Sequence, residues 1–368
     1  MFIPKSNMER ERIEGSLRRL ESTRYFEEPD RVPILLEVGA PFYAKVLGYT
    51  LNDYYRKVEI CKYVQVEGSR WAFRTLEDDR TSTIGEDDAG PDIGAVAEVI
   101  AFGCDISLPD DDNPWLSPWI IPGLRSLDDI EALEVPDPRG CVGRLRAHYV
   151  KAFGREIRVE EATNIHPPCS AAGSLMGPER LYTYLYKYPD AMHGLFGKLL
   201  ETFFAIKDYN DERRGVVANG IGLCDDHAGY LSEDMYRRFV LPYNKRIYER
   251  YGARWRSLHM DSRTDHIAKV LVDEYGIMDM DLGAAADIEK IKEAFDGRVI
   301  FNGNVDSRIL VAGSVEQIEM SAEHCIKSAA RGGGYIFDCG GETYAGIDPT
   351  RLIYMVRYVK KIGKYPIG

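Results

Sequence analysis

Downstream of residue 156, short apolar runs alternate with longer segments whose apolar positions recur at helical spacing. The apolar runs predict strands at 156–162, 215–223, 253–259, 277–281, 299–304 and 335–340. The other segments predict helices at 177–188, 189–200, 232–252, 263–276, 287–297, 314–334 and 348–366. This alternation indicates parallel βα units of an α/β fold. Their number favours a (β/α)8 TIM barrel over an open doubly wound sheet, whose G-x-G-x-x-G fingerprint is absent.

The chain before residue 156 is less regular. Alternating charges over residues 9–21 predict an N-terminal helical extension, and residues 29–39 predict a buried strand entered through prolines. Residues 97–108 could form a strand, and the Pro- and Asp-rich stretch up to 124 predicts a long loop. Trp115 in this loop is a candidate lid over a substrate, although loop tryptophans are also ordinary packing residues. We expect a single domain over residues 1–368.

Composition narrows the functional classes. The formal net charge is −12 and no basic stripe occurs, which argues against a nucleic-acid-binding surface. No run approaches the ~20 apolar residues that a membrane span needs, and the charged N-terminus lacks the apolar core of a signal peptide. The seven cysteines contain no C-x-x-C pair, so we expect reduced thiols, mostly in the core, and a cytoplasmic setting.

Polar residues follow most of the predicted strands of the second half. In a TIM barrel the catalytic side chains lie just after the strands. Residues that could bind a metal or move protons stand at those positions: Cys224–His227, His259, Asp261, Asp279, Asp281, Asn302, Asn304, Asp306 and Asp338–Glu342. This recurrence is the strongest functional signal in the sequence.

His259, Asp261 and Cys339 form the sharpest group of candidate metal ligands. Residues i and i+2 of a strand point to the same face, so His259 and Asp261 could share one ligand site. Cys339 ends a later strand and could reach the site across the barrel. Three protein ligands with an open fourth position are typical of catalytic zinc. On spacing alone, the favoured interpretation is a hydrogen-bonded His–Asp pair and a buried thiol.

Three further residues are candidates for catalysis. His227 could be a fourth ligand or a proton donor, and Asp226 or Glu342 could complete the coordination or supply a proton. The same stretch also fits an acidic turn that leads into a helix capped by Ser232.

Two residues are candidates for substrate binding. His166 follows a predicted strand, and the small residues after it allow a ligand to approach the backbone closely. Asn304 is the second candidate, although capping the next helix together with Asp306 is its more ordinary role.

The C-terminal half resembles the uroporphyrinogen decarboxylase superfamily. The stretches that carry the resemblance are DDHAGYLSEDMYRRFVLPYNKRI, SLHMDSRTDHIAKVLVDEYGIMDMD, VIFNGNVDSRILVAG and GGGYIFDCGG followed by IDPTRLIYMV. An N-terminal EEPDRVPILLE is also similar to the family. The resemblance implies a TIM barrel with one of two chemistries. One is cofactor-free decarboxylation of tetrapyrrole acetates, and the other is zinc-dependent methyl transfer with corrinoid proteins, coenzyme M or tetrahydrofolate.

Two departures decide between these chemistries. The decarboxylases of the family carry an R-Q-A-G-R motif after the first strand, where this chain has LLEVGAPFY without arginine. The zinc methyltransferases carry H-x-C and a distant Cys. His259 and Cys339 match this pattern, while Asp261 stands in place of the first Cys. One thiolate fewer leaves zinc more Lewis acidic, which suits an ether or hydroxyl oxygen.

The resemblance therefore implies a zinc-dependent methyltransferase acting between a small O-methyl substrate and a corrinoid protein. A D-x-H-x-x-G corrinoid-binding pattern is absent, so the corrinoid is expected on a separate protein. A homodimer is one arrangement that such barrels adopt. The alternatives are a metal-free decarboxylase of a small or tetrapyrrole carboxylic acid, and a non-catalytic barrel that binds a tetrapyrrole or corrinoid.

Overall fold

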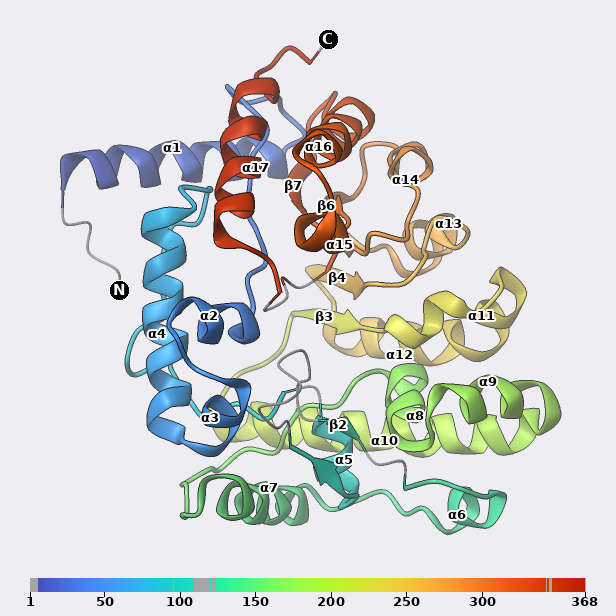
Figure 1. Cartoon of the computed structure of the whole chain (residues 1–368). Coiled ribbons are helices and arrows are strands. Elements are labelled where there is room, and N and C mark those ends of the chain that lie inside the picture. Colours follow the sequence, from blue (N-terminus) through green and yellow to red (C-terminus); the bar gives the residue numbers. More distant parts are fainter. Residues whose placement is uncertain are drawn as a thin grey trace.

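The architecture is that of an α/β protein with a central parallel sheet, seen in a computed structural model of the chain (Figure 1). The structure describes residues 6–94, 96–108, 119–120, 123–341, 343 and 346–367. Within these residues, five parallel strands pair in the order β3-β4-β5-β6-β7: β3 (Gly220–Cys224), β4 (Trp255–Met260), β5 (Asp279–Leu282), β6 (Ile300–Val305) and β7 (Tyr335–Cys339). The parallel βα organisation predicted from the sequence is thus confirmed, while the described ladders do not close into a ring.

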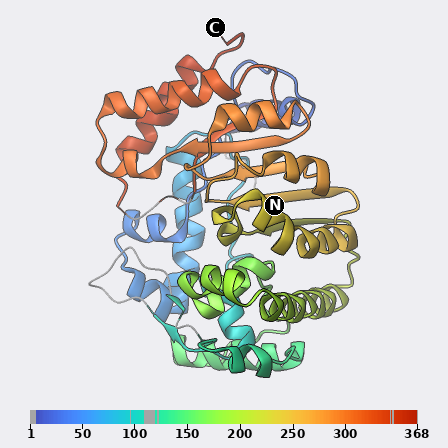
Figure 2. The same cartoon turned by 90° about the vertical axis from the view of Figure 1, so that its right-hand side faces the viewer.

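Helices connect these strands, and α17 follows the last one. They are α11 (Glu233–Phe239), α12 (Leu241–Tyr251), α13 (Ala268–Val270), α14 (Ile288–Phe295), α15 (Ser307–Ala312), α16 (Val315–Ala329) and α17 (Pro349–Ile362), with a 3-10 turn η1 (Asp226–Tyr230) and a π-turn η2 (Leu271–Tyr275). Ser232 caps α11, as predicted. The predicted helix 232–252 breaks at Val240, because Pro242 has no backbone N–H to continue it. Figures 1 and 2 show these units stacked in chain order.

The first half of the chain is mainly helical. It contains α1 (Asn7–Arg24), α2 (Ala40–Val46), α3 (Leu51–Arg56), α4 (Val58–Thr75), α5 (Ala97–Phe102), α6 (Leu127–Ala132), α7 (Pro138–Phe153), α8 (Pro168–Met176), α9 (Pro178–Lys187) and α10 (Pro189–Arg214). A small antiparallel pair joins β1 (Ile106–Ser107) to β2 (Trp119–Ile120). The N-terminal helical extension is confirmed as α1. None of the described helices is long and apolar enough to cross a membrane.

Three predicted strands before β3 are not regular strands. Residues 29–39 are extended but make only isolated bridges, one of them parallel between Ile34 and Phe337 of β7. Residues 156–162 join no ladder, because the backbone N–H and C=O of Ala162 bond the side-chain amide of Asn210 instead. Residues 97–102 form α5, which ends at Gly103 with a positive φ of 73°.

The extended segment 31–37 is held on one side by the sheet and on the other by Asp79. Phe337 N–H donates to the Pro33 carbonyl at 2.8 Å, and Leu35 N–H donates to the Phe337 carbonyl at 3.1 Å. On the other side, Asp79 N–H donates to the Ile34 carbonyl at 2.6 Å. The segment therefore lies beside β7 and continues the order of the sheet, although Pro33 supplies no donor of its own.

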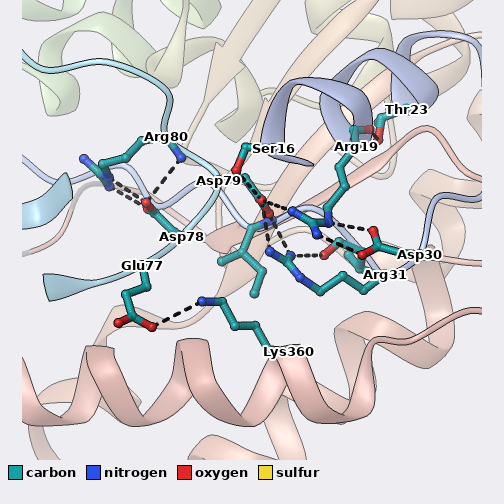
Figure 3. Close-up of polar contacts among 12 residues, drawn as sticks. Ser16, Arg19, Thr23, Asp30, Arg31, Glu77, Asp78, Asp79, Arg80 and Lys360 are labelled. Atoms are coloured by element: carbon teal, nitrogen blue, oxygen red, sulfur yellow. Dashed lines mark hydrogen bonds and ion pairs between the residues drawn. The ribbon is translucent and has the colours of Figure 1, made fainter. Parts of the chain in front are cut away.

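A buried carboxylate fixes α1 and this segment together (Figure 3). The Asp79 side chain is fully buried and accepts hydrogen bonds from Arg31 at 2.7 and 2.9 Å and from Arg19 at 3.1 Å. Ser16 Oγ and Ile34 N–H donate to the same carboxylate, each at 2.8 Å. Two guanidinium groups and two further donors thus compensate the cost of burying this charge.

We expect Asp79→Asn to lower the free energy of unfolding by about 3 kcal/mol or more, because it leaves the largely buried Arg31 without its anion and removes one of the two carboxylates that Arg19 contacts. The matched control is Glu77→Gln, since Glu77 is half-exposed and lies 3.7 Å from Lys360. That variant should cost less than about 1 kcal/mol. Urea unfolding of both variants measures the difference, and equal losses would contradict the anchoring role of Asp79.

Candidate metal centre

His259 lies in the middle of a row of polar residues formed by four neighbouring strands. The parallel register aligns Cys224 of β3 with His259 of β4, His259 with Asp281 of β5, and Asp281 with Asn302 of β6. Because this register is parallel, all four side chains stand at the same level near the carboxyl ends of the strands. The strand-end clustering expected from the sequence is therefore present.

A hydrogen-bonded chain orients the His259 ring. His259 Nδ1 lies 2.6 Å from Asp281 Oδ2, and Asn302 Nδ2 donates to Asp281 Oδ1 at 2.7 Å. The same amide lies 3.4 Å from Asp338 Oδ2, whose other oxygen accepts from Glu37 N–H at 3.0 Å. Burial, reinforced by the charge of Asp281, raises the pKa of Asp338 well above its usual range. The Asp281 carboxylate thus binds Nδ1 of His259 and leaves Nε2 to face the space at the carboxyl ends of the strands.

The other ring nitrogen of His259 faces two carboxylates. His259 Nε2 lies 3.5 Å from Asp261 Oδ1 and 3.9 Å from Asp226 Oδ1. Asp226 also accepts the Asp261 backbone N–H at 2.6 Å, which ties the turn after β3 to the end of β4. One potential ligand atom from each of these three residues lies within 4.8 Å of the others. Such a group, with both carboxylates partly open to solvent, could hold a metal ion.

The carboxylates around the His259 ring raise its affinity for a proton. Burial alone would lower the pKa of His259, but hydrogen bonds to Asp261 and Asp281 and the charge of Asp226 raise it to about 12. Glu37, His259 and Asp281 form a second group of neighbouring ligand atoms. Negative charge is therefore concentrated around the His259 imidazole, which must carry a proton or lie beside a metal cation.

Two glycines leave room for the Asp261 turn. A Cβ on Gly283 would lie 1.9 Å from the Asp261 carbonyl oxygen, so the two backbones are in direct contact. Gly341 has a φ of 100°, and a Cβ there would lie 2.9 Å from Asp261 Oδ1. Position 341 is thus the point after β7 that approaches Asp261, and it carries no side chain.

The structure brings together His259 and Asp261 with Asp226, which the sequence offered as a residue that could complete the coordination or supply a proton, but it does not place Cys339 with them. Successive residues of a strand point to opposite faces. Asp338 faces Asn302, so the Cys339 thiol lies on the other face of β7, where its neighbours include Ser307 and Cys325. Burial raises the pKa of this thiol well above its usual value.

Comparison with known proteins places this geometry in a family. The family model for uroporphyrinogen decarboxylase matches residues 17–362. The chain belongs to the uroporphyrinogen decarboxylase family. Curated relatives include the uroporphyrinogen decarboxylase of Chlorobium limicola, 29% identical over 65% of this chain and 71% of the relative. That of Thioalkalivibrio sulfidiphilus is 27% identical over 64% of this chain and 69% of the relative.

A solved structure confirms the fold of this uroporphyrinogen decarboxylase family member. A methyltransferase from Methanosarcina mazei superposes with a TM-score of 0.64, covering 93% of this chain and 97% of that protein. The two sequences are 17% identical, so the likeness concerns the fold.

The other residues predicted from the sequence of this family member have separate places in the fold. His227 lies in η1, its ring against α8, where a Cβ on Gly173 would meet it at 2.4 Å. Asn304 is buried and its amide donates to the carbonyls of Gly283 and Ala286, so it fastens the turn after β5. Asp306 caps α15, as predicted. Trp115 and Glu342 lie outside the described residues.

Sequence reasoning gave no role to two residues that organise the site. Asp281 was noted only as a strand-end carboxylate, and its D-x-D spacing with Asp279 was the available signal. Glu98 lies in α5, far from the strand ends along the chain, and nothing in its local sequence marks it.

We expect Asp281→Asn to weaken metal binding about 10- to 100-fold, because the ring loses the carboxylate that orients it. The matched control is Asp279→Asn, two residues earlier on the same face of β5, which should bind metal like the parent chain. Titration with zinc against a competing chelator measures both affinities. Equal weakening in the two variants would show that only bulk negative charge matters.

Metal affinity should rise with pH. His259 is protonated in the metal-free chain because its pKa is raised to about 12, so a bound ion displaces that proton. Below that pKa the affinity should increase by about tenfold per pH unit, with one proton released per ion. Calorimetry in buffers of different ionisation enthalpy counts the protons. Metal binding without proton release would rule out His259 Nε2 as a ligand.

Proposed function

We propose that this chain is a zinc-dependent methyltransferase, which moves a methyl group between a small O-methyl substrate and a corrinoid protein. The observation that carries the proposal is the His259 ring, fixed by Asp281 on Nδ1 and facing the carboxylates of Asp226 and Asp261 with Nε2. A carboxylate–histidine pair that leaves the second nitrogen to a cation is the usual support of a catalytic metal.

The donor set fits zinc. His259, Asp226 and Asp261 would supply one nitrogen and two oxygen ligands and leave a position for substrate. Without a thiolate, the ion would act as a strong Lewis acid toward an ether or hydroxyl oxygen. Coordination by the Cys339 thiolate, which the sequence predicted, would require the Cys339 side chain to move from the opposite face of β7.

The residues of the chain would orient the reactants. Asp281 keeps the His259 ring in one orientation, and the backbone contact between Asp261 and Gly283 fixes the second carboxylate. The corrinoid protein would approach at the carboxyl ends of the strands, where this centre lies. The name of the Methanosarcina structure, a methyltransferase that shares the fold, agrees with this proposal.

Decarboxylation is the second candidate, because the curated relatives carry the name uroporphyrinogen decarboxylase. Two observations weigh against it. Arg80, beside the first extended segment, is committed to Asp78 at 2.7 Å and to the Leu36 carbonyl at 3.0 Å. The carboxylates around His259 would also repel a substrate that carries several carboxylates. Release of carbon dioxide by the metal-free chain would support this candidate.

Methyl transfer can be tested with cobalt(I) cobalamin in place of the corrinoid protein. We expect the zinc-loaded chain to consume cobalt(I), seen by absorbance, when an aryl methyl ether is added. His259→Ala should abolish the reaction because it removes the central ligand, while Cys339→Ala should keep both zinc and activity. Absence of reaction with every small ether would refute the proposed function. Loss of zinc in Cys339→Ala would instead show that the Cys339 thiolate is a zinc ligand, as the sequence predicted.

A further inference from the structure

A buried glutamate holds His166 beside the metal centre. Glu98 lies in α5 with its side chain fully buried. Its Oε1 accepts the backbone N–H of His166 at 2.6 Å and is also hydrogen-bonded to Nδ1 of the His166 ring. One carboxylate oxygen thus fixes both the backbone and the ring of the same residue, which leaves Nε2 as the free ring nitrogen.

The second oxygen of Glu98 has no partner. Glu98 Oε2 is buried and makes no hydrogen bond to any described residue. A buried carboxylate with one unsatisfied oxygen costs free energy, and in native proteins it requires an explanation other than stability. Among the residues that the structure describes, His166 is the one that forms an ion pair with Glu98, so the two act as one unit.

His166 forms part of the wall of a cavity at the edge of the sheet. The cavity has a volume of about 280 Å³ and lies between residues 164–167 and the end of β3. The His166 side chain is 29% exposed, and Phe203, Ile221 and Leu223 supply an apolar surface. Cys224 also lines the cavity and is the ladder partner of His259. The cavity therefore adjoins the metal centre and has the size of a small aromatic ether.

A second set of contacts fixes the distance between His166 and the metal centre. The buried Asp225, at the end of β3, accepts the Ser170 hydroxyl at 2.7 Å and the Ser170 N–H at 3.1 Å. Ser170 lies in the first turn of α8, which begins two residues after His166. The next residue, Asp226, is a proposed metal ligand. Helix α8 and the turn η1, which carries Asp226, are thus held together through Asp225.

We propose that His166 is the general acid of the reaction, donating its Nε2 proton to the leaving oxygen of the methyl ether, with Glu98 as its positioning residue. The inference rests on the proposed function and names a proton donor for it. The substrate class is a small aryl or alkyl methyl ether that fits the mainly apolar cavity.

The step balances in atoms and electrons. The bond between the methyl carbon and the ether oxygen breaks, and its electron pair stays on the oxygen. The electron pair of the new bond to carbon would come from the cobalt(I) co-reactant of the proposed function, which would be formally oxidised by two electrons. The oxygen takes the proton from His166 Nε2 and leaves as an alcohol or phenol. Glu98 stabilises the protonated ring before the transfer and orients the neutral ring afterwards.

His227, the proton donor considered from the sequence, is less suited to this role. No hydrogen bond to its ring is found in the described part of the chain, and burial lowers its pKa. For His166, burial has the same effect, but the hydrogen bond and charge of Glu98, together with the charges of Asp226 and Asp225, outweigh it and raise the pKa. Of the two neighbouring histidines, His166 is the one whose surroundings favour a proton on the ring.

The test varies the leaving group. An ether of an acidic phenol, such as 4-nitroanisole, needs no proton on its oxygen, whereas anisole and alkyl methyl ethers do. We expect His166→Asn, which keeps a donor to Glu98, to lower kcat about 100-fold or more for alkyl ethers and only slightly for 4-nitroanisole. Glu98→Gln should show the same leaving-group dependence with smaller losses.

The matched control is His324→Asn. His324 is an exposed histidine of α16 that lies 3.9 Å from Glu289, and its loss should leave all rates unchanged. Equal losses for all ethers in His166→Asn, with the parent chain active, would overturn the acid role alone. A parent chain inactive with every ether would overturn the proposed function together with it. Imidazole NMR provides a readout without turnover: the His166 ring should lose its proton at lower pH in Glu98→Gln, and an unchanged titration would overturn the pairing.

Discussion

One imidazole held between carboxylates on both of its nitrogens determines the character of this site. The parallel register of β3 to β6 brings Cys224, His259, Asp281 and Asn302 to one level, and the turns after β3 and β4 add Asp226 and Asp261. So much negative charge in a partly buried place requires a compensating cation. The hydrogen bonds and charges of these carboxylates raise the pKa of His259, so a proton would fill this role when no metal is bound.

The distant N-terminal extension supports the same site. Asp79 binds Arg19 of α1 and both Arg31 and the backbone of Ile34, which fixes the extended segment against β7. Three residues further on, the backbone N–H of Glu37 donates to Asp338, the last member of the polar chain from His259. An anchor at one end of this segment therefore helps to position the carboxylates at the other. On the opposite side, Asp225 joins α8 to the turn η1 that carries Asp226, and this contact positions His166 next to α8.

The sequence predicted the parts of this arrangement that depend on local pattern. Strand-like runs after residue 215 and the i, i+2 spacing of His259 and Asp261 were sufficient for the sheet and for two of the three grouped residues, and the strand-end position of Asp226 made it a candidate for the third. The face on which Cys339 lies could not be predicted, because a shift of one residue in register reverses the facing of every side chain. The segments at 29–39 and 156–162 have strand-like composition, yet ladder formation depends on neighbours that the sequence does not reveal. Glu98 was missed because its partner, His166, is brought near only by the tertiary fold.

The central claim is that His259, Asp226 and Asp261 bind the metal through nitrogen and oxygen atoms alone. X-ray absorption at the zinc edge of the zinc-loaded chain tests it most directly, because sulfur and lighter ligands lie at different distances from zinc. The structure predicts a first shell of nitrogen and oxygen at about 2.0–2.2 Å. A sulfur neighbour at about 2.3 Å would contradict it and would place Cys339 in the coordination sphere.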